Sequence, residues 1–221
     1  MIDVNDYLSH LTGLLRQHFE GRLLYVGLQG SYLRGEASEH SDIDIMVIID
    51  GLSVSDLEAY RAAIASMDHF DKSCGFICSR EDMACWNPLE IAHLLGSTKD
   101  YFGTLRDFVP AYTQEDIRTF VKMSLNNLYH EICHRFIHAD RETNVAALPG
   151  TYKSVFFILQ NLHLLRSGAF VLTKGELLSV LDGKDRAVLQ RAMALAKGGA
   201  YDFEESYALL FSWCQETLQS L

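Results

Sequence analysis

Two aspartates stand at the head of the most apolar stretch of this chain. Asp42 and Asp44 flank the start of the run IDIMVII, residues 43–49, which is rich in β-branched residues and predicts a β-strand. The run is apolar on both faces beyond Asp44, so we expect a central strand that is covered on both sides. Side chains two positions apart on a strand point to the same face. The two carboxylates therefore face the same way, where they repel one another and resist burial.

A divalent cation would relieve this repulsion. Mg²⁺ prefers oxygen ligands and keeps water or phosphate oxygens as further partners. The pair Asp42 and Asp44 therefore predicts a magnesium site at the start of the strand. A strand-end turn with Ser41 would account for Asp42, but it would leave Asp44 inside the apolar run without a partner.

A glycine-serine corner precedes the aspartates. Residues 23–28 predict a short apolar strand that ends at Gly30-Ser31. If Tyr32 begins a helical turn, the amides of Ser31 and Tyr32 have no partner within the helix, and such a corner attracts an anion. Glycine also lets the backbone approach a ligand closely. Backbone amides that can donate hydrogen bonds to phosphate, next to a metal-binding pair of aspartates, predict a site for a nucleoside triphosphate (NTP).

The first half of the chain alternates helical and strand patterns. Residues 4–19 and 53–67 have the spacing of amphipathic helices, and residues 73–78 predict a third strand. Residues 81–86 predict a short helix, whereas residues 91–95 fit either a strand or a helix. These patterns indicate a compact α/β layer.

After Pro110 only helical patterns remain. Thr113 and Asp116 predict the start of a long helix, and a polar loop is expected over residues 139–150. Further helices are expected over residues 152–166, 173–183 and 185–197, and from residue 202. We therefore expect two domains, residues 1–110 and residues 111–221.

The composition is that of a globular chain with an excess of acid. The 221 residues are 48% hydrophobic and carry a net charge of −10. An acidic chain repels phosphate backbones, which argues against general nucleic-acid binding. The five cysteines have no zinc or CxxC spacing, so we expect reduced, mostly buried thiols and a cytoplasmic location. No signal peptide is evident, and no apolar run approaches the roughly 20 residues that span a membrane.

The motif at residues 30–44 has a counterpart in a known family. GS, ten intervening residues and then DID resemble the nucleotidyltransferase superfamily with a DNA polymerase β-like fold. RGE at residues 34–36 and the serine at residue 41 resemble its small bacterial members, and the likeness is greatest to aminoglycoside nucleotidyltransferases of the kanamycin type. A weaker similarity continues in NPL, LY and LP, at residues 87–89, 128–129 and 148–149.

The resemblance implies an α+β fold, in which a small mixed β-sheet nucleotidyltransferase domain is followed by an all-α helical bundle. It also implies that ATP or another NTP binds with its triphosphate at Gly30 and Ser31. Mg²⁺ would bridge the phosphates to Asp42 and Asp44, an acceptor hydroxyl would attack the α-phosphorus, and pyrophosphate would leave.

Three more residues are candidate contacts to the nucleotide. Arg34 and Ser41 lie inside the motif, and Arg34 is the stronger candidate for a phosphate contact. Lys153 begins the second helix of the bundle. It either contacts a phosphate or is a solvated lysine at a helix start.

The resemblance also implies a general base from the bundle. His130 falls on the position of the glutamate that takes the acceptor proton in the kanamycin-type enzymes, whereas Glu131 next to it is favoured by residue type. Adjacent helical positions differ by about 100°, so both cannot point equally well into one site. His130 also begins a stripe with His134 and His138, which fits a metal site, a polar face or ordinary surface residues.

The sequence departs from the family on its third strand. The superfamily usually carries a third carboxylate there, but KSCGFI at residues 72–77 contains no acid. Asp71, Glu81 or Asp82 could substitute, two aspartates could suffice, or a second metal could be weakly bound. The last two alternatives predict reduced activity or binding without turnover.

Three hypotheses follow. The first is a Mg²⁺-dependent nucleotidyltransferase that modifies a small hydroxylated molecule. The resemblance implies an aminoglycoside as one possible acceptor, and the acidic net charge of the chain suits a cationic acceptor. The second is an NTP-binding sensor or regulator with weak or no transfer, and the third is antitoxin-like transfer of AMP to a partner protein. A homodimer is compatible with the apolar residues 152–165, although an intramolecular core would use the same surface.

Overall fold

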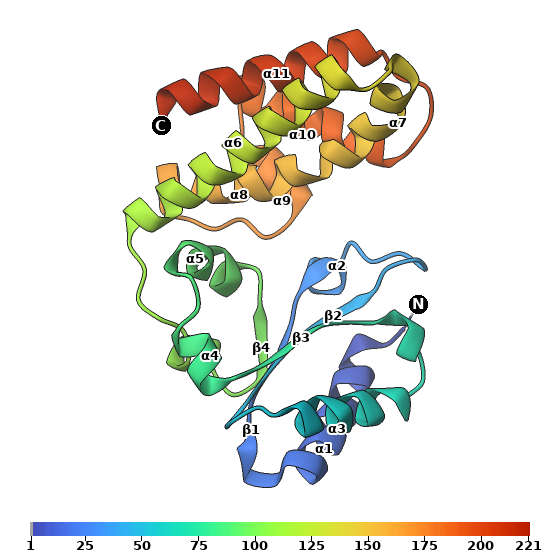
Figure 1. The fold of residues 1–221 in the computed structure, drawn as a ribbon, viewed down its shortest axis with the longest axis vertical. Coiled ribbons are helices and arrows are strands. Elements are labelled where there is room, and N and C mark those ends of the chain that lie inside the picture. Colours follow the sequence, from blue (N-terminus) through green and yellow to red (C-terminus); the bar gives the residue numbers. More distant parts are fainter. Residues whose placement is uncertain (1) are drawn as a thin grey trace. The chain divides into compact units, whose positions relative to one another are not determined.

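The computed structural model of this chain describes residues 2–221 (Figure 1). The chain divides into two compact units, Met1–Tyr112 and Thr113–Leu221. The first unit contains a small mixed sheet with helices, and the second contains helices alone. The predicted α+β fold class is therefore confirmed. Across the described part of the chain, no helix combines the length and the apolar character needed to cross a membrane.

The sheet of the first unit has four strands in the order β3-β2-β1-β4. Their bounds are Leu23–Leu28 for β1, Ile43–Ile49 for β2, Ser73–Ser79 for β3 and Lys99–Phe102 for β4. β1 pairs antiparallel with β2 and β4, whereas β2 pairs parallel with β3. β2 therefore has a neighbour on each side, as its apolar sequence predicts. The short and largely exposed β4 had no clear strand pattern.

β2 is buried on both faces of the sheet. Ile43, Ile45, Val47 and Ile49 pack on one face with the helices α1 (Val4–Phe19) and α3 (Val54–Ala65), which lie on the same side of the sheet in Figure 1. Met46 and Ile48 join a smaller core on the opposite face. Asp44 lies on that second face, because it is two positions before Met46.

The other elements of the first unit are short. They are the helices α2 (Gly30–Leu33), α4 (Arg80–Ala84) and α5 (Pro88–Gly96), and the 3-10 turns η1 (Glu20–Arg22), η2 (Phe70–Lys72) and η3 (Leu105–Asp107). The side chain of Asn87 caps α5 and Pro88 occupies its first turn, an arrangement that favours a helix start. Residues 91–95, which fitted either a strand or a helix, are therefore helical.

The second unit consists of helices around one core. Their bounds are Gln114–His138 for α6, Arg141–Thr151 for α7, Lys153–Ser167 for α8, Lys174–Val180 for α9, Gly183–Ala196 for α10 and Phe203–Ser220 for α11. Most of the apolar residues of α8 are buried in this core, among them Val155, Phe156, Leu159 and Leu162. The apolar surface of α8 is thus used within its own unit, and it gives no separate support for a homodimer.

The prediction of a polar loop at residues 139–150 is wrong, because most of this segment forms α7. Asp140 caps the helix by accepting a hydrogen bond from the amide of Thr143 at 2.8 Å. Pro149 lies in the last turn, where its missing N–H leaves the carbonyl of Val145 without a helical donor. The hydroxyl of Tyr201 donates to that carbonyl instead. A contact distant in sequence therefore satisfies the carbonyl that the proline leaves without a helical donor.

Gly183 is also placed differently from expectation. The capping box of Thr173 and Glu176 begins α9 as predicted, but the helix ends at Val180. Gly183 then starts α10, with a positive φ of 49°. Its conformational freedom serves the start of a helix and not the end of one.

Candidate active site

The pairing of β1 with β2 places the glycine-serine corner beside the aspartates. The amide of Gln29, just past β1, donates to the carbonyl of Asp44 at 2.8 Å. Asp44 is the second residue of β2 and is half-buried, whereas Asp42 precedes the strand and is exposed. Gly30 follows Gln29 and so lies next to Asp44.

Gly30 and Asp44 are in close contact. Gly30 has a φ of +68°, and a β-carbon built on it would lie 1.8 Å from Oδ2 of Asp44 and 2.7 Å from its Cγ. The carboxylate therefore occupies the space that any side chain at residue 30 would need. Glycine is required here for its positive φ and for the close approach alike.

α2 begins at Gly30, two residues earlier than the sequence suggested. No side chain caps its N-terminus among the described residues, and the first amides of a helix have no partner within it. The chain then turns back on itself, since the amide of Glu36 donates to the carbonyl of Ser31 at 2.9 Å. Ser31 is half-buried within this turn.

Arg34 is held by neighbouring side chains. Its Nε donates to Oε2 of Glu36 at 3.0 Å, and the side chains are only 13% and 23% exposed. His93 of α5 lies close enough to Arg34 for an electrostatic interaction between the two side chains. Burial, with a smaller contribution from Arg34, lowers the pKa of His93 to about 4. No local sequence pattern connects His93 with the motif, so its position near Arg34 is apparent only in the folded chain.

Ser41 has a local role in the structure. Its hydroxyl accepts a hydrogen bond from the amide of Ser38 at 2.9 Å, and its own amide donates to the carbonyl of Ser38 at 3.1 Å. The side chain thereby closes the turn that leads into Asp42.

Cys74 is the neighbour of Asp44 on β3. The parallel register pairs Asp44 with Cys74, so the two side chains point to the same face. Although Cys74 is exposed as a residue, burial of the thiol raises its pKa, with further increases from the Asp44 and Asp42 carboxylates. The expectation of mostly buried cysteines is wrong, because Cys74 and Cys85 are exposed and only Cys78 and Cys214 are buried.

The structure separates two of the three candidates for a third carboxylate, Glu81 and Asp82, from the Asp pair. Glu81 and Asp82 lie in α4, after the end of β3. Because β3 runs parallel to β2, α4 follows the end of the sheet opposite to Asp44. Asp71 lies in η2 and is exposed. Within residues 2–221, no three or more His, Cys, Asp or Glu side chains form a group suited to a metal ion.

The residues at this site nevertheless fit a magnesium ion. Asp42 and Asp44 offer hard carboxylate oxygens, the ligand type that Mg²⁺ prefers, and water or phosphate oxygens commonly complete its coordination. Gly30 leaves no side chain between the Asp44 carboxylate and the backbone of α2. The two carboxylates would therefore supply part of the coordination shell of a bound Mg²⁺, and phosphate oxygens would complete it.

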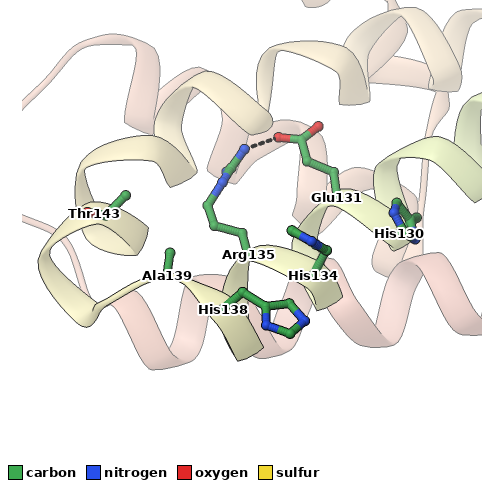
Figure 2. Close-up of a pocket in the computed structure, with 7 residues that line it drawn as sticks. All are labelled: His130, Glu131, His134, Arg135, His138, Ala139 and Thr143. Carbon is green, nitrogen blue, oxygen red and sulfur yellow. Dashed lines mark hydrogen bonds and ion pairs between the residues drawn. The ribbon is translucent and has the colours of Figure 1, made fainter.

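The candidate bases lie in the second unit, on α6. Oε1 of Glu131 accepts hydrogen bonds from Nη2 of Arg135 and from the hydroxyl of Thr151, the latter at 2.9 Å, and Nη1 of Arg135 donates to Thr151 at 2.6 Å. Figure 2 shows Arg135 pointing toward Glu131, and both residues line a cavity of about 550 Å³. Glu131 is thus held in one orientation.

The histidine stripe lines the same cavity. The ring centroids of His130 and His134 are 5.8 Å apart, and those of His134 and His138 are 4.6 Å apart. Glu131 also borders a second cavity of about 250 Å³ between α6 and α8, with Asn127 among its other lining residues. His130 lines only the first of these two cavities.

Lys153 is the first residue of α8 and is exposed. It follows Tyr152, which is buried and donates its hydroxyl proton to the carbonyl of Ser206 at 2.7 Å. Lys153 belongs, like His130 and Glu131, to the second unit. The candidates Gly30, Ser31, Arg34, Ser41, Asp42 and Asp44 all belong to the first.

Part of the first unit matches a known protein family. Residues 13–73, which include β1, the corner and the Asp pair, match the model of the nucleotidyltransferase domain family. These residues therefore match a nucleotidyltransferase domain, in agreement with the predicted family resemblance and enzyme class.

The fold of the whole chain has a solved counterpart. Spectinomycin adenyltransferase AAD(9) from Enterococcus faecialis, crystallised with ATP and spectinomycin, is similar with a TM-score of 0.58 and 14% sequence identity, over 97% of this chain and 99% of that chain. At this identity the likeness concerns the fold alone.

Two further similarities are weaker. A toxin-antitoxin with AMP-PNP has a TM-score of 0.33 and 24% identity, over 58% of this chain and 92% of that chain. A mutant of the toxin-antitoxin MntA-HpeT has a TM-score of 0.32 and 23% identity, over 62% and 94%. These TM-scores are too low to support an argument. No curated protein matches the sequence.

Proposed function

We propose that this chain is a Mg²⁺-dependent nucleotidyltransferase that moves a nucleoside monophosphate from an NTP to a hydroxyl of a small molecule. The observation that carries the proposal is the contact between Gly30 and the Asp44 carboxylate. It lies within the residues that match the nucleotidyltransferase domain, and it joins the glycine-serine corner to the Asp pair.

The first unit would bind the NTP. Asp42 and Asp44 would hold Mg²⁺, which when bound neutralises the charge of the phosphates. The amides at the start of α2, at Ser31 and Tyr32, would donate hydrogen bonds to phosphate oxygens. Arg34 would add a positive charge close by, in an orientation supported by Glu36.

The second unit would supply the general base. The acceptor hydroxyl attacks the α-phosphorus, its proton passes to the base, and pyrophosphate leaves. We assign the base to Glu131 in preference to His130, because Arg135 and Thr151 orient one of its carboxylate oxygens and leave the other for the acceptor. Lys153 remains a proposed phosphate contact.

The proposed acceptor is small, hydroxylated and cationic. The net charge of −10 favours a cation over an anion. Aminoglycosides are the first acceptors to test, because the sequence resembles aminoglycoside nucleotidyltransferases and AAD(9), which has a similar fold, was crystallised with ATP and spectinomycin. A cytoplasmic location and the absence of general nucleic-acid binding stay predictions.

A second candidate function is NTP binding without efficient transfer. The observation that favours it is the thiol of Cys74 beside Asp44, where the family resemblance leads us to expect a carboxylate nearby. Such a protein would act as a sensor or regulator.

One experiment separates these functions. The protein is incubated with Mg²⁺ and labelled NTPs, with and without a panel of aminoglycosides and a cell extract, and pyrophosphate release is followed. Label on a small molecule supports the first proposal, and label on a protein supports AMP transfer to a partner. Binding of NTP without any product contradicts the enzyme and supports the sensor.

A matched pair of variants tests the metal assignment. Asp44→Asn should abolish metal-dependent NTP binding, whereas Asp50→Asn, the same change at the opposite end of β2, should leave it intact. Unchanged binding in Asp44→Asn would show that the metal assignment is wrong.

A further inference from the structure

The face of the sheet that carries Asp44 offers one neighbouring position on β3. In a parallel pair, residues opposite each other point to the same face. Cys74 lies opposite Asp44, while Ser73 lies opposite Ile43 and points to the other face. Cys74 is exposed, so a larger side chain at this position would meet no buried core.

The next positions along β3 cannot carry a metal ligand. A β-carbon at Gly75 would lie 1.9 Å from the carbonyl oxygen of Ile45, and its φ of +115° disfavours any side chain. Phe76, the next residue on the Asp44 face, stacks on Trp86 with ring centroids 5.7 Å apart. Residue 74 is therefore the place on β3 from which a side chain could share a ligand set with Asp44.

A second metal ion would need an anionic ligand at that place. Two-metal sites hold their ions about 3.5–4 Å apart, and two divalent charges at such a distance require carboxylates around both. Cys74 lies opposite Asp44 and brings no carboxylate oxygen to that place. A thiol is also a soft ligand, whereas Mg²⁺ and Mn²⁺ favour oxygen.

We infer that this site binds a single divalent cation together with the triphosphate, and that residue 74 is the position that decides this number. The inference rests on the proposed function, since it concerns the metal count at the same site. With a single cation, no second metal ion would lie beside the acceptor hydroxyl to lower its pKa. Removal of the proton from that hydroxyl would then depend more on the general base of the chain.

The test counts cations without relying on activity. The purified protein is saturated with a non-hydrolysable ATP analogue and titrated with Mn²⁺, and the ratio of bound Mn²⁺ to bound analogue is measured by equilibrium dialysis. Electron paramagnetic resonance of the same samples distinguishes an isolated Mn²⁺ from a spin-coupled pair. The variants are Cys74→Asp, Cys74→Ser as the matched control, and Asp44→Asn.

We expect a ratio of one and an uncoupled signal for the unmodified protein and for Cys74→Ser. Cys74→Asp should raise the ratio to two and introduce the coupled signal. Thermal melting confirms that each variant is folded, which the exposure of residue 74 favours.

The outcomes separate the inference from the proposed function. A ratio of two in the unmodified protein overturns the inference and leaves the proposed function intact. A folded Cys74→Asp that binds the analogue and stays at a ratio of one shows that residue 74 does not decide the number. If neither the unmodified protein nor Asp44→Asn binds the analogue in a Mn²⁺-dependent way, the proposed function itself fails.

Discussion

A β-carbon on Gly30 would lie 1.8 Å from Oδ2 of Asp44. The two residues are fourteen positions apart, and β1–β2 pairing brings them together. Any side chain added at residue 30 would therefore displace the Asp44 carboxylate. A substitution of Gly30 thus perturbs the candidate site without removing a charge.

Gly30→Ala should weaken NTP binding at least about tenfold, which corresponds to about 1.4 kcal/mol. The added methyl group would displace the Asp44 carboxylate, in addition to the strain of an alanine at a positive φ. Gly35→Ala is the matched control, because Gly35 has nearly the same φ of +67° but nothing within 4 Å of an added β-carbon. Calorimetric titration with a non-hydrolysable ATP analogue and Mg²⁺ measures both affinities. Equal losses in the two variants would mean that strain alone matters.

Glu131→Gln should lower the rate of transfer by about 10²–10⁴-fold and leave NTP affinity unchanged. The substitution removes the proton acceptor but keeps the shape that Arg135 and Thr151 hold. His130→Gln on the same helix is the control and should have a much smaller effect. The measurement is kcat with the acceptor found in the transfer assay. A large loss in His130→Gln with an active Glu131→Gln would reverse the assignment.

The first unit should lose stability in mild acid through His93. Burial lowers the pKa of His93 to about 4, so between about pH 6.5 and pH 4 the unfolded chain binds a proton that the folded chain does not. Stability therefore falls as the pH falls through this window and is unaffected by His93 above it. His93→Gln should reduce the slope of unfolding free energy by up to about 1.4 kcal/mol per pH unit.

Urea unfolding at several pH values measures this slope. His40→Gln, at an exposed position in the same unit, is the matched control. A slope that is the same in the unmodified protein and in His93→Gln would contradict the role of His93.

Asn144→Ala should destabilise the second unit by about 2 kcal/mol. The buried side-chain amide of Asn144 donates to the carbonyls of Arg135, Ala139 and Asp140, where α6 ends and α7 begins. Removing it leaves these carbonyls with fewer donors at a junction where the Asn144 side chain itself is buried. Thermal or chemical unfolding measures the change, and Asn126→Ala, at an exposed position of α6, is the control. An effect no larger than that of the control would show that α7 does not depend on this contact.

Much of the fold follows from local patterns. The apolar run of β2 predicts a central strand, and the capping boxes at Thr113 and Thr173 mark the starts of α6 and α9. Capping is a short-range interaction, which the order of the residues reveals directly. The motif from Gly30 to Asp44 likewise lies within a short stretch, and for this reason it could be interpreted from the sequence.

Contacts between residues that are distant in the chain decided the features that local sequence patterns do not predict. In α7, Pro149 cannot donate to the carbonyl of Val145, and Tyr201, far along the chain, donates to it instead. Likewise, Cys74 was one thiol among five until the register of β3 with β2 placed it beside Asp44. The sequence alone determined that a two-aspartate site follows a glycine corner. Only the tertiary structure decided which side chain stands next to it, because strand register depends on contacts between residues that are distant in the chain.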